Sequence, residues 1–175
     1  MLMDIRPLEP DDREALERFI GRVPEGDRTF FKEDVEASEV IDAWTRPGPA
    51  RAVAVADGEV VGYVAVVPLH GWSDHVGEVR LIVDPGHRGQ GIGRELARRA
   101  VLEAVALDLG KLVVEVVADQ APTIAMFRAL GFDPEALLTD HVRDQAGALR
   151  DLMILAQSVE AQWSAMSVAG IADEL

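Results

Sequence analysis

A strand pattern, a glycine-rich turn and a helix pattern follow one another near the middle of the chain. The apolar run from Val79 to Val83 leads directly into DPGHRGQGIGRELARR, which has three glycines between Arg88 and Gly93. The first turn of a helix has unpaired N–H groups and about half a positive elementary charge. Glycine there costs about 1 kcal/mol and needs a reason. The stretch therefore predicts a backbone cradle for an anion.

The charge distribution supports an anion site at this turn. The chain has a formal net charge of −14, but residues 80 to 99 reverse the sign with five arginines against Asp84 and Glu95. An acidic surface repels a phosphate backbone, so binding to nucleic acid is disfavoured. The acidic residues outside this window are suited to a cationic substrate. The alternative is that they only keep the protein soluble, as in many acidic chains.

Hydrophobic periodicity predicts an α+β fold with a twisted, mixed, mostly antiparallel sheet of about seven strands and about four flanking helices. The expected strands are residues 2–6, 51–56, 60–67, 76–83, 112–117, 136–143 and 149–156. The expected helices are residues 11–23, 33–44, 91–110 and 121–130. We expect one domain over residues 1–157 and a helical extension over 158–175, which either caps the domain or pairs with a second subunit in a homodimer.

Some local expectations are more specific. The segment PEGDRTFF is expected to be a loop, and Gly110 is expected to close the long helix. The run Leu112 to Val117 is almost continuously apolar, which predicts a strand buried on both faces.

Composition excludes several classes of protein. The chain has no cysteine, so it can form no disulfide, thiolate metal site or cysteine nucleophile. Its four histidines lack the spacing of metal ligands, so no metal site is expected. It shows neither a secretion leader nor an apolar run long enough to cross a membrane. We expect a cytoplasmic protein with no membrane partner.

Three glycine-turn systems compete for RGQGIG. A nucleotide-hydrolysis loop needs Lys and then Ser or Thr after its last glycine, where this chain has Arg94 and Glu95. A dinucleotide fingerprint needs a repeated β-α-β pattern, whereas the upstream strands form hairpins. The third system is the pyrophosphate motif of the GCN5-related N-acetyltransferase (GNAT) family, which Arg88 to Gly93 resembles. The preceding LIVDP, the later Gly131-Phe132 and the order of elements are also similar to that family.

The resemblance implies acetyl-CoA as acyl donor. Its pyrophosphate would lie over the backbone N–H groups of the glycine turn, and its arm would run along the fourth strand. The residues implied in cofactor binding are Leu81, Ile82, Val83, Arg88, Gly89, Gln90, Gly91, Ile92, Gly93, Arg94, Gln120 and Phe127.

The implied activity is N-acetyltransfer to a primary amine of a small molecule, peptide or protein, by direct attack in a ternary complex. The alternative is a non-catalytic acyl-CoA sensor or partner module. Phe127 keeps that alternative open, because many members of the family have a tyrosine there that protonates the leaving thiolate. Water or another side chain, such as a histidine, would then have to serve as the acid.

Glu78 is the candidate general base, because members of the family often carry a carboxylate on this strand. The alternative is an exposed strand carboxylate paired with Arg80. A bulge in this strand would change the face on which Glu78 lies, so the sequence leaves that face open. Tyr63 is expected in the core or the sheet. Aromatic side chains between the first two strands are expected either to line the acceptor site or to pack in the core: Phe30, Phe31 and Trp44.

Overall fold

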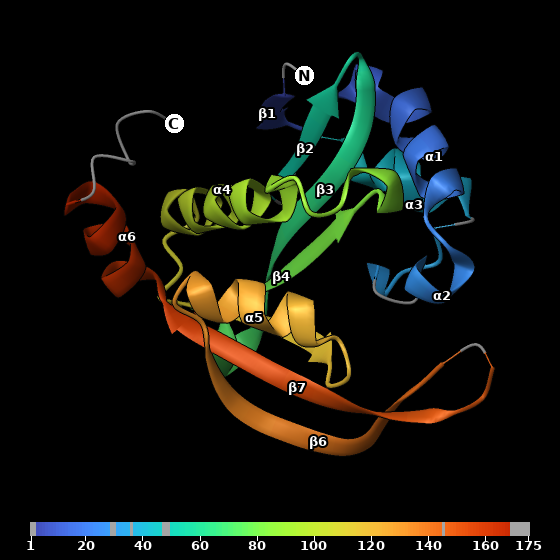
Figure 1. The fold of residues 1–175 in the computed structure, drawn as a ribbon. Helices are drawn as coiled ribbons and strands as arrows, with labels where there is room; N and C mark the ends of the chain where they lie inside the picture. The colour runs from blue at the N-terminus through green and yellow to red at the C-terminus, as the bar shows by residue number, and fades with distance from the viewer. Residues whose placement is uncertain (1–2, 29–30, 36, 47–49, 145, 169–175) are drawn as a thin grey trace.

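The computed structural model describes residues 3–28, 31–35, 37–46, 50–144 and 146–168, and it shows one seven-stranded sheet (Figure 1). The order across the sheet is β1-β2-β3-β4-β5-β7-β6. The pair β4–β5 is parallel, and the other five neighbouring pairs are antiparallel. The predicted mixed, mostly antiparallel sheet is confirmed. Its strands are β1 (Met3–Pro7), β2 (Arg51–Ala56), β3 (Glu59–Pro68), β4 (Val76–Val83), β5 (Lys111–Val117), β6 (Asp133–Arg143) and β7 (Leu149–Ser158).

Helices cover both faces of the sheet. On one face lie α4 and α5, and on the other lie the helices between β1 and β2 (Figure 1). The helices are α1 (Arg13–Arg22), α2 (Glu25–Arg28), α3 (Ser38–Trp44), α4 (Ile92–Ala106), α5 (Ala121–Ala129) and α6 (Val159–Val168). The C-terminal α6 contacts α4 and β7. Among the described residues, no helix combines the length and apolar character that a membrane crossing requires.

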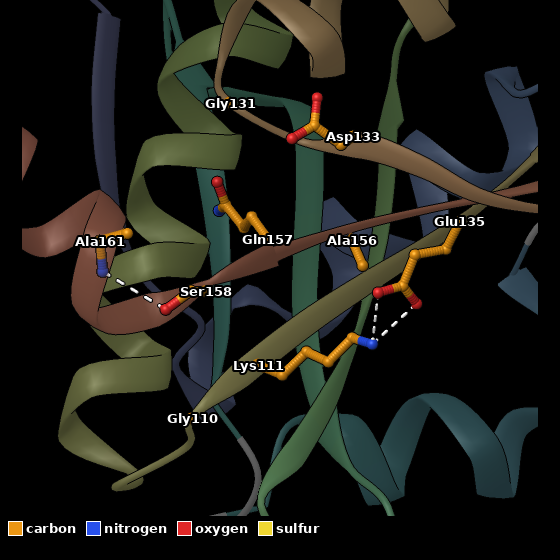
Figure 2. A pocket seen from close by; sticks show the side chains of 9 residues that line it. All are labelled: Gly110, Lys111, Gly131, Asp133, Glu135, Ala156, Gln157, Ser158 and Ala161. Atoms are coloured by element: carbon orange, nitrogen blue, oxygen red, sulfur yellow. Dashed lines mark hydrogen bonds and ion pairs between the residues drawn. The ribbon is translucent and has the colours of Figure 1, made fainter.

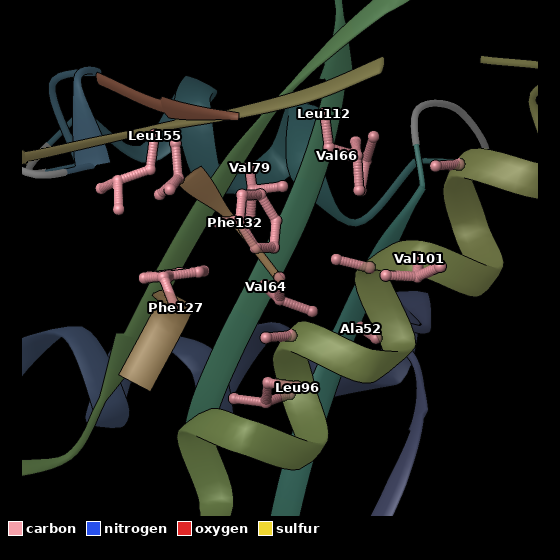
Figure 3. Close-up of a cluster of buried hydrophobic side chains, with 14 of the residues drawn as sticks. Ala52, Val64, Val66, Val79, Leu96, Val101, Leu112, Phe127, Phe132 and Leu155 are labelled. Atoms are coloured by element: carbon pink, nitrogen blue, oxygen red, sulfur yellow. The ribbon is translucent and has the colours of Figure 1, made fainter. Parts of the chain in front are cut away.

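The core on the α4 side forms where the apolar side of α4 packs on alternate residues of β3. Leu96 and Val101 of α4 face Val64 and Val66 of β3 (Figure 3). Alternate strand residues point to the same face, so these two valines present a continuous apolar surface to the helix. The helix approaches β3 closely at Gly62, where a Cβ would lie 2.7 Å from Leu96 Cδ1.

The core on the opposite face belongs to the N-terminal helices. Phe19 of α1 and Trp44 of α3 pack with Tyr63 and Ala65 of β3, the residues that alternate with those facing α4. The Trp44 and Tyr63 rings are stacked, with centroids 4.8 Å apart. Phe31 joins the same core and is 1% exposed.

Two local expectations are wrong. The segment PEGDRTFF contains a helical turn, α2, because the carbonyl of Pro24 accepts bonds from the N–H groups of Asp27 and Arg28. The helix predicted to run to Gly110 ends at Ala106. There Asp108 takes φ +56°, and the N–H groups of Asp108 and Leu109 donate to the carbonyls of Val105 and Ala104. This closing motif usually carries glycine, and aspartate tolerates it.

The expectation that β5 is buried on both faces is also wrong. Its burial alternates, with Leu112, Val114 and Val116 buried against the α4-side core and the intervening residues only partly covered. The run is apolar except at Glu115, because Val113 stands between the buried residues on the half-covered face.

Candidate functional site

The glycine turn has the backbone geometry of an anion cradle. Gly89 and Gly91 have φ of +76° and +85°, a region that L side chains rarely adopt. Gly91 is the residue that precedes α4, and its carbonyl accepts the first helical bonds, from Arg94 and Glu95. The N–H groups before Arg94 have no acceptor in the helix, because an α-helix leaves its first donors unpaired. The positive end of α4 is therefore open at this turn.

Gly93 has a different reason to be glycine. A Cβ at this position would lie 3.0 Å from the sulfur of Met126, which belongs to α5. Its absence lets α4 and α5 approach each other. The first two glycines thus serve the conformation of the turn, and the third serves packing.

A gap between β4 and β5 continues from the turn into the sheet. The two strands pair from Val76 with Lys111 to Val79 with Val114. Beyond that point β4 pairs with β3 alone and β5 with β7 alone. The edge of β4 from Arg80 to Val83 therefore faces the gap without a partner strand, so an extended amide-containing ligand can add there like a strand.

The turn and the gap form one cleft of about 790 Å³. Eleven of the twelve residues expected to bind the cofactor line it; Gln90 lies outside, exposed at the tip of the turn. Glu78 does not line the cleft, although its partners Lys32 and Arg80 do. The lining consists of Asp27, Lys32, Val79, Arg80, Leu81, Ile82, Val83, His87, Arg88, Gly89, Gly91, Ile92, Gly93, Arg94, Val114, Glu115, Val116, Gln120, Pro122, Thr123, Met126 and Phe127.

The arginines near the turn differ in how they are held. Arg88 donates to Asp27 of α2 at 2.6 Å and to the carbonyl of Val83 at 3.2 Å. Arg94 is exposed and pairs with no carboxylate in the described part of the chain. The charge free to meet an anionic ligand is therefore that of Arg94, whereas Arg88 is partly neutralised.

Asp84 holds the end of β4 in place. It accepts bonds from Arg22 Nε at 2.7 Å and from the N–H of Gly86 at 2.9 Å, and His87 Nδ1 lies 3.5 Å away. Burial opposes ionisation of this carboxyl, but the bonds from Arg22 and Gly86, together with the nearby His87, outweigh it and lower its pKa. The Asp84 carboxylate is therefore charged at neutral pH.

Glu78 lies in an ion-pair cluster at the end of the cleft where β4 and β5 meet. Its Oε1 is 2.9 Å from Lys32 Nζ and 3.0 Å from Arg80 Nε. Lys32 also donates to Glu115 of β5, so its ammonium bridges the two strands. Burial raises the pKa of Glu78, but the bonds and charges of Lys32 and Arg80 together lower it below its ordinary value. The carboxylate is ionised and already has two cationic partners.

The face of Glu78, which the sequence leaves open, is decided by the ladder between β3 and β4. Its register is regular from Gly62–Val83 to Pro68–Gly77, with no bulge. Strand alternation therefore holds, and Glu78 and Arg80 share the face of Ile82, which packs in the core of the N-terminal helices. The ion pair with Arg80 that the alternative predicts is present, but the expected exposure is wrong, because the Glu78 side chain is only 13% exposed. The role of Glu78 as a base stays a prediction.

The aromatic candidates are mostly buried. Phe127 is 1% exposed and packs edge-on against Phe132 at 5.2 Å, so it offers the cleft an apolar wall and no proton. Tyr63 lies in the core and accepts a bond from Arg51 Nε at 3.0 Å, and burial raises its pKa to about 12. Phe31 and Trp44 belong to the same core. Phe30 lies outside the described residues.

Sequence reasoning missed the residues that reach the cleft from other elements. Asp27 and Lys32 come from the segment between β1 and β2, and Glu115 from β5. Thr123 and Met126 of α5 line the opposite wall. No local pattern marks these positions, because only the packing of separate elements brings them to one cavity.

Comparisons with known proteins agree with this architecture. The family model described as the acetyltransferase (GNAT) family matches residues 14–132. YjgM of Escherichia coli (strain K12), named as an N-acetyltransferase, is 29% identical over 157 residues, which cover 85% of this chain and 94% of that protein. Streptothricin acetyltransferase of Streptomyces lavendulae is 40% identical over 77 residues, 44% of this chain and 40% of that protein.

A solved structure shows the same fold. It is yncA from Salmonella typhimurium with its cofactor acetyl-CoA, which superposes with a TM-score of 0.73 at 24% identity and covers 90% of this chain and 94% of that one. The family match spans the strand, the glycine turn and the gap between β4 and β5. This chain belongs to the GNAT family of acetyltransferases.

Proposed function

We propose that this protein transfers an acetyl group from acetyl-CoA to a primary amine by direct attack within a ternary complex. The observation that carries the proposal is the single cleft that joins an anion cradle to an open strand edge. A ligand with a pyrophosphate at one end and an amide-containing arm would use both parts of it.

The residues of the cleft fit acetyl-CoA. A Cβ on Gly89 or Gly91 would meet no protein atom within 4 Å, so the space beside this backbone is free for phosphate oxygens. Positive charge comes from the N-terminus of α4 and from Arg94, which has no carboxylate partner among the described residues. The open edge of β4, from Arg80 to Val83, would bond the amides of the arm, while Gln120 and Phe127 line the other side.

Acetyl-CoA supplies the acyl group as a thioester, and the chain must position the amine and move its proton. We propose that Glu78 accepts that proton, since its lowered pKa keeps it ionised. Its present partner is the ammonium of Lys32, a residue of the cleft lining, and this supports access of a cationic amine to the carboxylate. Phe127 has no proton for the departing thiolate, so we assign that role to water.

The proposed acceptor is a cationic primary amine on a small molecule or a peptide. Glu78 and Glu115 make one end of the cleft suitable for an ammonium group. This is the end where β4 and β5 meet, which we call the closed end. Relatives named for amine substrates support this class, among them the L-amino acid N-acetyltransferase AaaT of Escherichia coli (strain K12). We further propose that residues 1–157 form the catalytic unit and that the extension 158–175 stabilises it through the contacts of α6 with α4 and β7.

The test is release of the CoA thiol when the protein and acetyl-CoA meet a panel of primary amines. We expect at least one amine to support release, and we expect Glu78→Gln to lower turnover by roughly a hundredfold, the scale of general-base catalysis. Glu135→Gln is the matched control, because Glu135 also pairs with a lysine but lies at a different pocket. Tight acetyl-CoA binding with no release for any amine would favour the binding-only module instead.

A further inference from the structure

Lysine is rare in this chain, and one of its lysines has an unusual position. The sequence contains two lysines, Lys32 and Lys111, against fifteen arginines. The distinction matters chemically, because an amine can take an acyl group and a guanidinium stays charged and non-nucleophilic. Lys32 lines the cleft and Lys111 does not.

The side chain of Lys32 is held at the closed end of the cleft. Its Nζ bonds Glu78, next to Val79 on β4, and Glu115, next to Val114 on β5. Val79 and Val114 are the last pair before the two strands separate. The backbone of Lys32 has φ +60°, a strained region for a residue other than glycine, so the surrounding contacts hold the loop in this form.

The path from the glycine turn to Lys32 matches the direction in which the cofactor would lie. With the pyrophosphate at the turn after Val83, the arm would run back along β4 toward Val79. The four steps from Val83 to Val79 span about 13 Å at strand spacing. The acyl end of the donor would then arrive beside the ammonium of Lys32. This step rests on the proposed function, because it requires acetyl-CoA in the cleft.

We propose that Lys32 is itself an acceptor, so that the protein acetylates its own side chain. The Lys32 ammonium loses one proton to the Glu78 carboxylate, and the neutral Nζ attacks the thioester carbon. A C–N bond forms and the C–S bond breaks, and the thiolate leaves and takes up a proton. Nζ loses its second proton to water, and Glu78 returns its proton to solvent. The products are acetyl-lysine and free CoA, with no further reactant.

The modification would change the cleft. An acetylated Lys32 carries no charge and cannot pair with Glu78 and Glu115. The two carboxylates would then be left without their lysine partner at the acyl end, where a cationic acceptor can pair with them. Self-acetylation would thus remove an internal competitor for the acceptor amine.

The second lysine provides an internal control. Lys111 is also ion-paired, with Nζ 2.6 and 2.7 Å from the oxygens of Glu135, and its side chain is 35% exposed against 31% for Lys32 (Figure 2). It lies at a separate pocket with Gln157 and Ser158. Uncatalysed acetylation should therefore treat the two lysines alike, whereas a donor bound in the cleft would reach Lys32 alone.

The experiment is peptide mass spectrometry of the whole protein after incubation with acetyl-CoA. We expect Lys32 to be acetylated at least about tenfold faster than Lys111, since a bound donor raises the effective concentration. The rate per molecule should not change when the protein is diluted. Gly91→Glu, which places a carboxylate in the cradle, should reduce the rate at Lys32 to that at Lys111. Lys32→Arg, which keeps the charge but has no amine that takes an acyl group, should abolish the modification at this position.

Equal rates at the two lysines, or a rate per molecule that rises with protein concentration, would overturn the inference. If acetyl-CoA binds and external amines are acetylated while Lys32 stays unmodified, this inference fails alone. If acetyl-CoA does not bind at all, the proposed function fails with it.

Discussion

Replacing Gly91 by glutamate should weaken acetyl-CoA binding at least about tenfold while the fold survives. Gly91 has φ +85°, so any L side chain there costs about 1–2 kcal/mol of folding stability. No protein atom lies within 4 Å of the Cβ that the substitution adds. The folded state can therefore accommodate the side chain, and the new carboxylate would occupy the anion cradle.

The loss of affinity follows from the charge. A carboxylate about 5 Å from one phosphate charge costs about 3 kcal/mol at an effective dielectric constant of 20, and less at the open mouth of the cleft, where water screens it. Since each 1.4 kcal/mol is a factor of ten, affinity should fall between about tenfold and several hundredfold. Isothermal titration calorimetry with acetyl-CoA measures the change directly.

Gly147→Glu is the matched control for this experiment. Gly147 has φ +84°, no protein atom lies within 4 Å of its added Cβ, and it is absent from the cleft lining. It should lose the same 1–2 kcal/mol of stability as Gly91→Glu and keep the affinity of the unmodified protein. Unchanged affinity in Gly91→Glu, at a melting temperature matching that of the control, would refute the assignment of the pyrophosphate to this turn.

Two further predictions concern the core. The chain has a single tyrosine, and burial raises the pKa of Tyr63 to about 12, so phenolate absorbance should rise near pH 12 in the folded protein and near pH 10 in urea. Because the pKa is raised, the protonated phenol of Tyr63 contributes stability that is complete below about pH 10 and is lost as the pH rises toward 12. Titration of Tyr63 near pH 10 in the folded protein would contradict its burial. Gly62→Ala places a Cβ 2.7 Å from Leu96 Cδ1 and should destabilise by about 1–3 kcal/mol in denaturant melts. Gly21→Ala, in open space on α1, should stabilise by about 0.5–1 kcal/mol, and equal effects of the two changes would contradict the packing of α4 on β3.

Local chemistry explains why much of the fold is predictable. The hairpin between β2 and β3 follows from Asp57-Gly58, both of which have positive φ in the structure. The glycine turn follows from the same conformational rule at Gly89 and Gly91. The prediction fails where a residue other than glycine takes the positive φ. At the end of α4 this residue is Asp108, which closes the helix in place of the expected Gly110.

The sequence by itself determines the strand, the glycine turn and the helix, because each is set by neighbouring residues. It also determines that Phe127 cannot donate a proton. Only the tertiary structure decides what stands around Glu78. The regular ladder with β3 sets its face, and a loop more than forty residues away brings Lys32 to it. The separation of β4 from β5 then turns two strand edges and that loop into one cleft, since a cavity is a property of packed elements and of no single segment.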